Sequence, residues 1–332
     1  MTRTVRFHEI GGPEVLRLED LRPGEPGPGE VLIRVDAIGL NRAEALFRSG
    51  RYIEQPVKLP SGLGNEAAGV VEAVGPGVTG FGTGQAISVV PSFSHNDYGV
   101  YAERAVVPAS ALLPRADGVD AVTGASVWMP YLTAYGAMVE VGGMRAGDLA
   151  VVTAASSSVG LAAIQTANRV GATPVAVTRT REKRQRLLDA GAAEVVVSDE
   201  EDVTERVREL TGGRGAEFVF DAVAGPGVVD LARAVAPDGA LFLWGAQSGL
   251  PTPYPGFDLG MPALSLRTYT MLEITRDPGR MHRAASFITS GLRTGSLRPV
   301  VDRLFPLEEI VRAHRHMESN TQFGKIVVTV PH

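Results

Sequence analysis

The residues best placed to do chemistry lie in a turn of small side chains between residues 153 and 160. Four of them form its centre: Ser156, Ser157, Ser158 and Val159. An apolar run precedes the turn, and residues 161–170 carry apolar side chains at helical spacing. A strand, a tight turn and a helix in this order leave free N–H groups and the positive end of the helix dipole at the turn. Such a turn is suited to a pyrophosphate, although a ligand-free helix capped by serine has the same composition.

The residues after the next predicted strand, 175–177, indicate which dinucleotide binds. Folds that bind NAD place an acidic residue at this strand end, about 20 residues after the turn. Here Thr178 and Arg179 stand at that point, and Lys183 follows. A guanidinium fork and an ammonium group both suit the 2′-phosphate of NADPH. The sequence therefore predicts NADPH rather than NADH.

Composition restricts the partners of this 332-residue chain. Its net charge is −5 and its arginines are scattered, so neither nucleic acid nor an anionic membrane is an expected partner. It has no cysteine, which excludes disulfides, thiolate chemistry and a four-thiolate zinc site. No apolar run approaches the ~20 residues of a transmembrane helix, and the N-terminus lacks the apolar stretch of a signal peptide. We therefore expect a cytoplasmic location.

The elements around the turn indicate two domains. Short strands separated by Gly/Pro turns precede a predicted helix over residues 121–138, as in a partly closed β-barrel. Strand–helix alternation begins at Leu149 and predicts a doubly wound parallel sheet. We expect an α/β fold in which a dinucleotide-binding domain, residues 124–265, is inserted into a catalytic domain made of residues 1–123 and 266–332.

Seven segments, distributed over more than 300 residues, carry a family resemblance. In order they read FHEIGGPEVLRLED, IGLNRAE, RSGRY, LPSGLGNEAAGVVEAVGPGV, YLTAYGAM, AASSSVG and QFGKIVV. Together they resemble the medium-chain dehydrogenase/reductase superfamily, and within it the zinc-free NADPH:quinone oxidoreductase (zeta-crystallin-like) branch. The resemblance implies a Rossmann domain inserted into a GroES-like domain. It also implies a homodimer joined through the sheet edge near residues 264–271.

Three positions decide the question of a catalytic metal. Zinc-dependent members of that superfamily carry Cys where Asn41 stands, His where Asn65 stands, and a second Cys near Met129. None of these side chains is a good zinc ligand, and no metal is expected. The histidines, His95 included, show no ligand spacing, and we interpret them as surface or satisfied side chains.

The resemblance also implies the remaining site residues. Tyr52 stands where related enoyl-thioester reductases have a proposed proton donor, and with Asn41 it is expected to orient or protonate the developing oxyanion. The residues expected at the nicotinamide end are Asn41, Thr133, Gly245, Gln247, Ser248, Phe323, Gly324 and Lys325. The walls of a substrate pocket between the domains, beside Tyr52, are expected from Phe93, Trp128, Tyr131 and Tyr269. The loop 92–98 is longer than simple quinone reductases need, and we expect it to narrow the pocket.

Several functions are compatible with this sequence. The first is hydride transfer from NADPH to a small quinone or α,β-unsaturated carbonyl. The second is reduction of an enoyl thioester of the polyketide or fatty-acid type. The third is binding of NADPH with little turnover. A zinc alcohol dehydrogenase is disfavoured by the three missing ligands.

Overall fold

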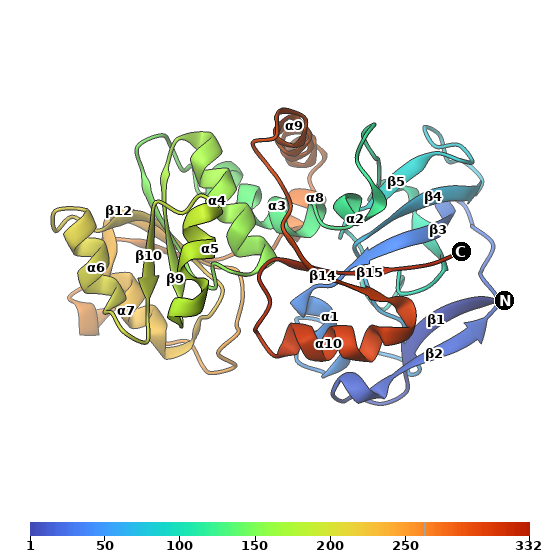
Figure 1. Cartoon of the computed structure of the whole chain (residues 1–332), viewed down its shortest axis with the longest axis horizontal. Coiled ribbons are helices and arrows are strands. Elements are labelled where there is room, and N and C mark those ends of the chain that lie inside the picture. Colours follow the sequence, from blue (N-terminus) through green and yellow to red (C-terminus); the bar gives the residue numbers. More distant parts are fainter. Residues whose placement is uncertain (262) are drawn as a thin grey trace. The chain divides into compact units, whose positions relative to one another are not determined.

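The computed structural model describes residues 1–261 and 263–332 and divides the chain into two units (Figure 1). Unit 1 comprises Met1–Met129 and Pro299–His332, and unit 2 comprises Pro130–Arg298. The second boundary differs most from the predicted one, 265/266. The chain remains in unit 2 beyond that point because β13 (Ser265–Thr268) pairs in parallel with β12 (Val235–Leu243).

Unit 2 contains a parallel sheet of six strands. Its order is β10-β9-β8-β11-β12-β13, which is the strand order of a dinucleotide-binding fold, with its switch point between the first and fourth strands of the unit. The other strands are β8 (Leu149–Val152), β9 (Thr173–Thr178), β10 (Glu194–Val197) and β11 (Ala216–Asp221). This strand order confirms the predicted doubly wound sheet. Its strands are short apolar runs because a parallel sheet of this kind is buried on both faces.

Within the described residues, four helices of unit 2 contact this sheet: α4 (Ser158–Val170), α5 (Arg184–Asp189), α6 (Val203–Leu210) and α7 (Val228–Arg233). Two further helices, α8 (Leu272–Thr275) and α9 (Pro278–Thr294), pack against each other. Alternate strand residues, such as Val151 and Val219, pack in one cluster with Val207 of α6 and Val228 of α7. Burial of these apolar side chains fixes the sheet and thereby the loops at its carboxyl edge.

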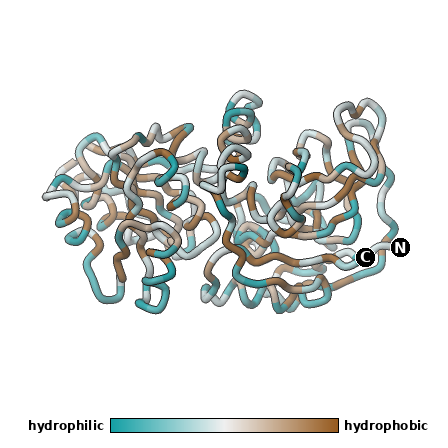
Figure 2. Tube along the Cα trace, turned by 45° about the horizontal axis from the view of Figure 1, so that its top comes forward, coloured by the Kyte–Doolittle hydropathy of each residue, from teal (hydrophilic) through white to brown (hydrophobic). Residues whose placement is uncertain are grey.

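Unit 1 is built around β3 (Glu30–Gly39). This long strand pairs with β4 (Ala67–Val74), β6 (Arg104–Pro108) and β15 (Lys325–Thr329). The sheet is completed by β5 (Ala86–Val89), β7 (Leu112–Pro114) and β14 (Val301–Pro306), while β1 (Thr2–Phe7) and β2 (Leu16–Leu21) form a separate pair. Its helices are α1 (Arg42–Arg48), α2 (Ala121–Gly124) and α10 (Ile310–Glu318). Hydrophobic and hydrophilic segments alternate along the chain in both units (Figure 2).

The prediction of one continuous helix over residues 121–138 is wrong. The chain instead forms α2, then α3 (Trp128–Tyr135), then a π-helical turn, Gly136–Val141. The Ser126 hydroxyl donates to the carbonyl of Val122, a local bond that competes with helix continuation. The strands β6, β7 and β14 and the helix α8 were not predicted, since three to six residues carry too little periodicity. Across the described residues, every helix is too short or too polar to cross a membrane.

Candidate functional site

The predicted pyrophosphate turn connects β8 to α4 in unit 2. Ser157 is the N-cap of α4, and its hydroxyl accepts from the N–H of Gly160 at 3.0 Å. A Cβ on Gly160 would lie 2.6 Å from Cα of Ala155, so glycine is required for the turn to close against the helix. Ala154 has a φ of +46°, the left-handed region that favours glycine. The turn therefore keeps the compact backbone of a dinucleotide site although serines replace glycines.

The basic residues at the end of β9 divide into engaged and exposed groups. Arg181 pairs with Glu200, and Arg184 donates to the carbonyl of Val195 at 3.1 Å. Lys183 donates to the hydroxyl of Ser156 at 3.0 Å, which links the strand tip to the turn. The Arg179 side chain is exposed and makes no ion pair within the described part of the chain. The tip thus presents two cations beside the turn, as the sequence predicted, and Thr178 ends the strand as a buried residue.

Asp221, at the end of β11, is a site residue that the sequence did not reveal. Its buried carboxylate accepts from the Thr153 hydroxyl at 2.5 Å and from the N–H groups of Val223 and Ala224. The Thr153 hydroxyl in turn accepts from the N–H of Ala222 at 2.9 Å. Asp221 therefore holds the loops after β8 and β11 together. Only an Asp at the carboxyl end of a predicted strand could have indicated it.

The predicted segment after β12 joins the same edge. Gln247 donates its N–H to the carbonyl of Ala222 at 3.1 Å, and Ser248 donates to that of Val223 at 2.9 Å. A Cβ on Gly245 would lie 2.6 Å from the Ala222 oxygen. The Gln247 side chain is exposed. We call the loops after β8, β9, β11 and β12 the carboxyl edge; it brings together the predicted serines, Lys183, Gly245, Gln247 and Ser248.

In unit 1, strand register places two predicted residues, Asn41 and Lys325, beside one further residue, Glu66. β15 runs antiparallel to β3 with Val327 opposite Gly39, so Lys325 lies opposite Asn41. β4 pairs Ala67 with Ile38 of β3, which places Glu66 beside Gly39. Lys325 Nζ donates to Asn41 Oδ1 at 2.6 Å and to Glu66 Oε2 at 2.5 Å. We call Asn41, Glu44, Glu66 and Lys325 the ionic cluster.

Glu44 completes the ionic cluster through the capping of α1. Its carboxylate accepts from the Asn41 N–H at 2.6 Å. Glu44, Glu66 and Lys325 are each at most 1% exposed. One cation therefore faces two carboxyl groups, and burial raises the pKa of Glu44 to about 7 against the opposing charge of Lys325. Near neutral pH the ionic cluster holds a proton that an exposed glutamate would have lost.

The position of Asn41 changes its expected role. Its amide nitrogen lies 3.1 Å from the Gly39 carbonyl and 3.2 Å from Glu66 Oε2, and its oxygen accepts from Lys325. The amide is thus occupied inside unit 1, and we infer that it positions α1 rather than stabilising an oxyanion. Lys325 is likewise enclosed, and Phe323 is buried with its N–H 3.1 Å from the Asp302 carboxylate. Gly324 lies between them.

Tyr52 and the loop 92–98 form an aromatic group in unit 1. The ring of His95 lies 5.0 Å from that of Phe47 and 5.9 Å from that of Tyr52. Burial, and then the charges of Glu44 and Glu54, raise the pKa of Tyr52 to about 12, so the phenol stays protonated. Phe93 packs on the barrel core and against Tyr98, at 5.5 Å. His95, rather than Phe93, is the ring beside Tyr52.

The other predicted wall residues are buried. The Tyr131 hydroxyl donates to Gln165 at 2.8 Å, and the Tyr269 hydroxyl donates to the carbonyl of Leu132 at 3.2 Å. Both bonds lie within unit 2 and engage the polar ends of these rings. Trp128 is 5% exposed, and Thr133, which was expected at the nicotinamide end, is 6% exposed. These side chains support the packing of their own units.

The histidines differ from one another in a way that the sequence did not predict. His314 is fully buried between Arg48, at 2.8 Å, and the Tyr101 hydroxyl, at 3.2 Å, as the satisfied interpretation requires. His316 bonds Asp302 at 2.7 Å. His95 is 3% exposed, yet neither ring nitrogen has a partner among the described residues. The interpretation of His95 as surface or satisfied is therefore wrong.

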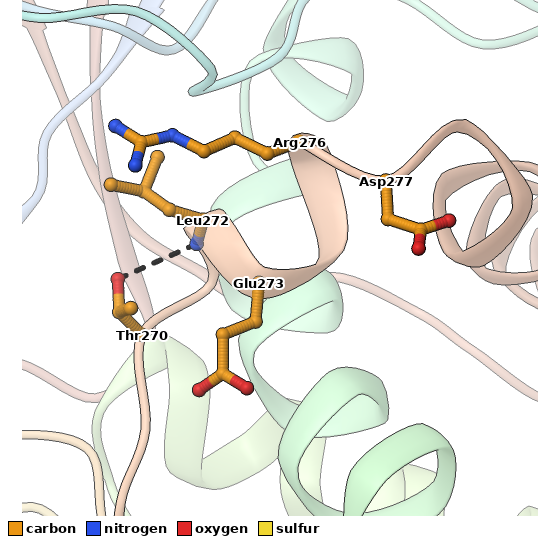
Figure 3. Close-up of a pocket in the computed structure, with 5 residues that line it drawn as sticks. All are labelled: Thr270, Leu272, Glu273, Arg276 and Asp277. Carbon is orange, nitrogen blue, oxygen red and sulfur yellow. Dashed lines mark hydrogen bonds between the residues drawn. The ribbon is translucent and has the colours of Figure 1, made fainter.

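One hollow of the described surface lies in unit 2, directly after Tyr269 in the sequence. It is lined by Thr270, Leu272, Glu273, Arg276 and Asp277 around α8 (Figure 3). Leu272 donates its N–H to the Thr270 hydroxyl at 3.4 Å, and Glu273 pairs with Arg267. Its charged side chains are engaged or exposed, so it adds no reactive group. In the described chain no three His, Asp or Glu side chains gather as a metal site.

Comparisons with known proteins agree with the fold of both units. Residues 158–290 match the family model described as zinc-binding dehydrogenase, and residues 27–117 match that of the alcohol dehydrogenase GroES-like domain. The chain is 33% identical over 332 residues to a quinone oxidoreductase of Pseudomonas aeruginosa, covering 99% of each. It is 29% identical over 336 residues to a 2-haloacrylate reductase of Burkholderia sp, again covering 99% of each. The solved structure of Escherichia coli quinone oxidoreductase complexed with NADPH superposes with a TM-score of 0.91 at 28% identity, covering 99% of this chain and 100% of that one.

Proposed function

This chain belongs to the quinone oxidoreductase branch of the medium-chain dehydrogenase/reductase superfamily, and from that premise we propose its reaction. It is an NADPH-dependent oxidoreductase that transfers a hydride to a quinone or to the β-carbon of an α,β-unsaturated carbonyl. Bound NADPH supplies the hydride and leaves as NADP+. A proton from water completes the reduced product, so that one acceptor, one NADPH and one proton are consumed together.

One observation carries this proposal: two cations and no acid stand at the tip of β9. Arg179 is exposed there, and Lys183 is tethered to Ser156 of the turn. A 2′-phosphate suits this pair of charges, whereas a ribose diol would need a carboxylate. Gly160 lets the turn close tightly on Ala155, and the start of α4 is the position at which helix N–H groups would meet a pyrophosphate. The residues present thus fit NADPH.

The protein groups proposed for the acceptor are hydrogen-bond donors rather than acids. Tyr52 keeps its proton over the whole neutral range because its pKa is raised to about 12. It would donate a hydrogen bond to the developing oxyanion and keep its own proton. Asn41 would act through the position of α1, since its amide is bound to Lys325.

Turnover of three acceptors tests the proposal and separates the alternatives. NADPH oxidation is followed by nicotinamide absorbance with 1,4-benzoquinone, cyclohex-2-enone and crotonyl thioester. We expect the first two to be reduced. Preference for the thioester would favour an enoyl-thioester reductase, and tight NADPH binding without oxidation by any acceptor would sink the enzymatic reading.

We further propose that the activity is independent of zinc. The positions at which zinc-dependent relatives carry ligands hold Asn41, Asn65 and Met129. Asn41 Oδ1 and Glu66 Oε2 already bind the ammonium of Lys325, and the Met129 N–H donates to Glu66 at 2.8 Å. Stoichiometric zinc in the purified protein, with loss of turnover on chelation, would contradict this.

A homodimer in the cytoplasm completes the proposal. β13 is an edge strand of the unit 2 sheet and carries exposed Ser265, Arg267 and Thr268, so a second copy could continue the sheet there. A light-scattering mass near one 35.0 kDa chain would exclude the dimer. Cytoplasmic location fits a reaction that consumes NADPH, and cell fractionation checks it.

A further inference from the structure

His95 combines burial with a complete lack of hydrogen-bond partners in the described residues. Its side chain is 3% exposed, and both Nδ1 and Nε2 are enclosed without a partner. A buried polar group left unpaired costs roughly 1–3 kcal/mol, so an imidazole with two such nitrogens requires an explanation.

The backbone that carries His95 is held firmly. Glu54 accepts from the His95 N–H at 2.8 Å and from the Ser94 hydroxyl at 2.6 Å. The Asn96 side chain accepts from the Val57 N–H at 2.9 Å and donates to the Gln55 carbonyl at 3.0 Å. These four bonds connect the loop 92–98 to the loop after Tyr52. They therefore fix the position of the backbone that carries the His95 ring.

A hollow of about 170 Å³ adjoins this ring. His95 lines it together with Lys58, Ser61, Asp97 and Tyr98, among others. The Ser61 hydroxyl is occupied by the Gly62 carbonyl at 3.0 Å. The wall carries one cation, Lys58, and one anion, Asp97, and therefore has no net preference for a charged ligand.

The ionisation state of His95 limits what it can bind. Burial lowers the pKa of His95 to about 4, against the opposing charge of Glu54. Neutral imidazole offers one donor and one acceptor. Its ring packs against those of Phe47 and Tyr52, which hold the imidazole in place from the side of the core.

We propose that His95 is a specificity-determining residue that donates a hydrogen bond to the carbonyl oxygen of a neutral, flat acceptor entering this hollow. The inference rests on the proposed reduction of quinones or enones and names the group that would recognise them. A carboxylate-bearing acceptor would gain nothing from a neutral imidazole beside Asp97.

Kinetics on three variants test the inference. His95→Phe should raise KM for cyclohex-2-enone about ten-fold, the value of one neutral hydrogen bond, while the Kd for NADPH is unchanged. His95→Gln, which keeps a donor, should recover most of that loss. His282→Gln, an exposed histidine of α9, is the control and should behave as the unsubstituted protein. Unchanged KM in His95→Phe would overturn the inference.

A binding measurement separates this inference from the proposed reaction. Protein labelled with ¹⁵N-histidine is titrated with cyclohex-2-enone without NADPH, and the His95 resonances are assigned from their loss in His95→Gln. We expect a shift of the His95 ring nitrogens alone among the six histidines. If that shift occurs but the protein reduces no acceptor, the proposed reaction fails and the recognition role stands. If acceptors are reduced without any shift at His95, the recognition role fails.

Discussion

The carboxyl edge of unit 2 and the ionic cluster of unit 1 use polar groups in opposite ways. At the carboxyl edge, backbone N–H groups and short hydroxyls close the loops, and the charged Arg179 is exposed. In the ionic cluster, charged side chains hold the segments together, and Glu44, Glu66 and Lys325 are almost wholly buried. A ligand with its own charges would be met by the exposed Arg179, which requires little desolvation. The ionic cluster instead depends on mutual pairing, because an unpaired charge in its place would be unstable.

Loss of Lys325 should give the largest effect and test the dependence on pairing. Lys325→Met leaves the buried Glu66 without its cation, and removing one partner of a buried pair costs roughly 3–5 kcal/mol. Trp244→Phe leaves Trp128 as the single tryptophan, which reports on unit 1. In that background, urea unfolding followed by fluorescence measures the change. Lys58→Met, at an exposed lysine, is the control, and an equal effect of the two substitutions would refute the role of the ionic cluster.

The pH dependence of stability should expose the proton on Glu44. Its pKa is about 7 in the folded chain and 4.5 in the unfolded chain, so the folded state binds more protons between these values. Stability therefore falls as pH rises from 4.5 to 7. Glu44→Gln lacks this decline and should gain about 3 kcal/mol relative to the unsubstituted protein above pH 7, at about 1.4 kcal/mol per pH unit.

The matched control for Glu44 is Glu72→Gln. Glu72 is a partly exposed carboxylate paired with Arg104 at 2.8 Å. Burial lowers the pKa of His95 and of His314, so both imidazoles reduce stability as pH falls below 6.5 in every variant and cancel in the comparison. Parallel pH profiles for Glu44→Gln and the unsubstituted chain would show that Glu44 carries no extra proton.

Substitution of Arg179 should weaken the cofactor site without loosening the fold. Arg179→Gln removes an exposed cation, and hydrogen bonds to a charged group contribute about 1.5–3 kcal/mol. We expect the Kd for NADPH to rise by about ten- to hundred-fold and that for NADH to stay constant, as measured by nicotinamide fluorescence. Arg181→Gln is the matched control, because Arg181 already pairs with Glu200. If Arg179→Gln raised the Kd for NADPH and for NADH equally, Arg179 would not be the residue that binds the 2′-phosphate.

A methyl group in the turn gives the smallest expected change and tests the backbone side of the comparison. In Gly160→Ala the Cβ would approach Cα of Ala155 to 2.6 Å, and overpacking of this kind costs about 1–3 kcal/mol. Trp128→Phe leaves Trp244 to report on unit 2. Gly227→Ala, where nothing surrounds the added Cβ, should be nearly neutral. If Gly160→Ala is equally neutral and binds NADPH normally, the turn does not require glycine.

The elements of the fold were predictable where apolar periodicity is long or regular. The strands of unit 2 and the helix α6 follow from their own residues, since alternation along the chain is a local property. The break between α2 and α3 was not predictable from apolar periodicity, because the Ser126 hydroxyl bonds the Val122 carbonyl at this point. Short strands such as β7 exist only through their partners.

The sequence by itself determined the small-residue turn before α4 and the basic strand tip, because those residues are neighbours along the chain. Only the tertiary structure decided the role of the side chains that meet from distant segments. Asn41 and Lys325 are 284 positions apart and meet through the register of β15 against β3, and that contact engages the amide which the sequence assigned to an oxyanion. Nothing in the sequence around His95 distinguishes it from an exposed loop histidine. Its burial beside Phe47 and Tyr52, with both nitrogens unpaired, arises from loop-to-loop bonds that no local pattern encodes.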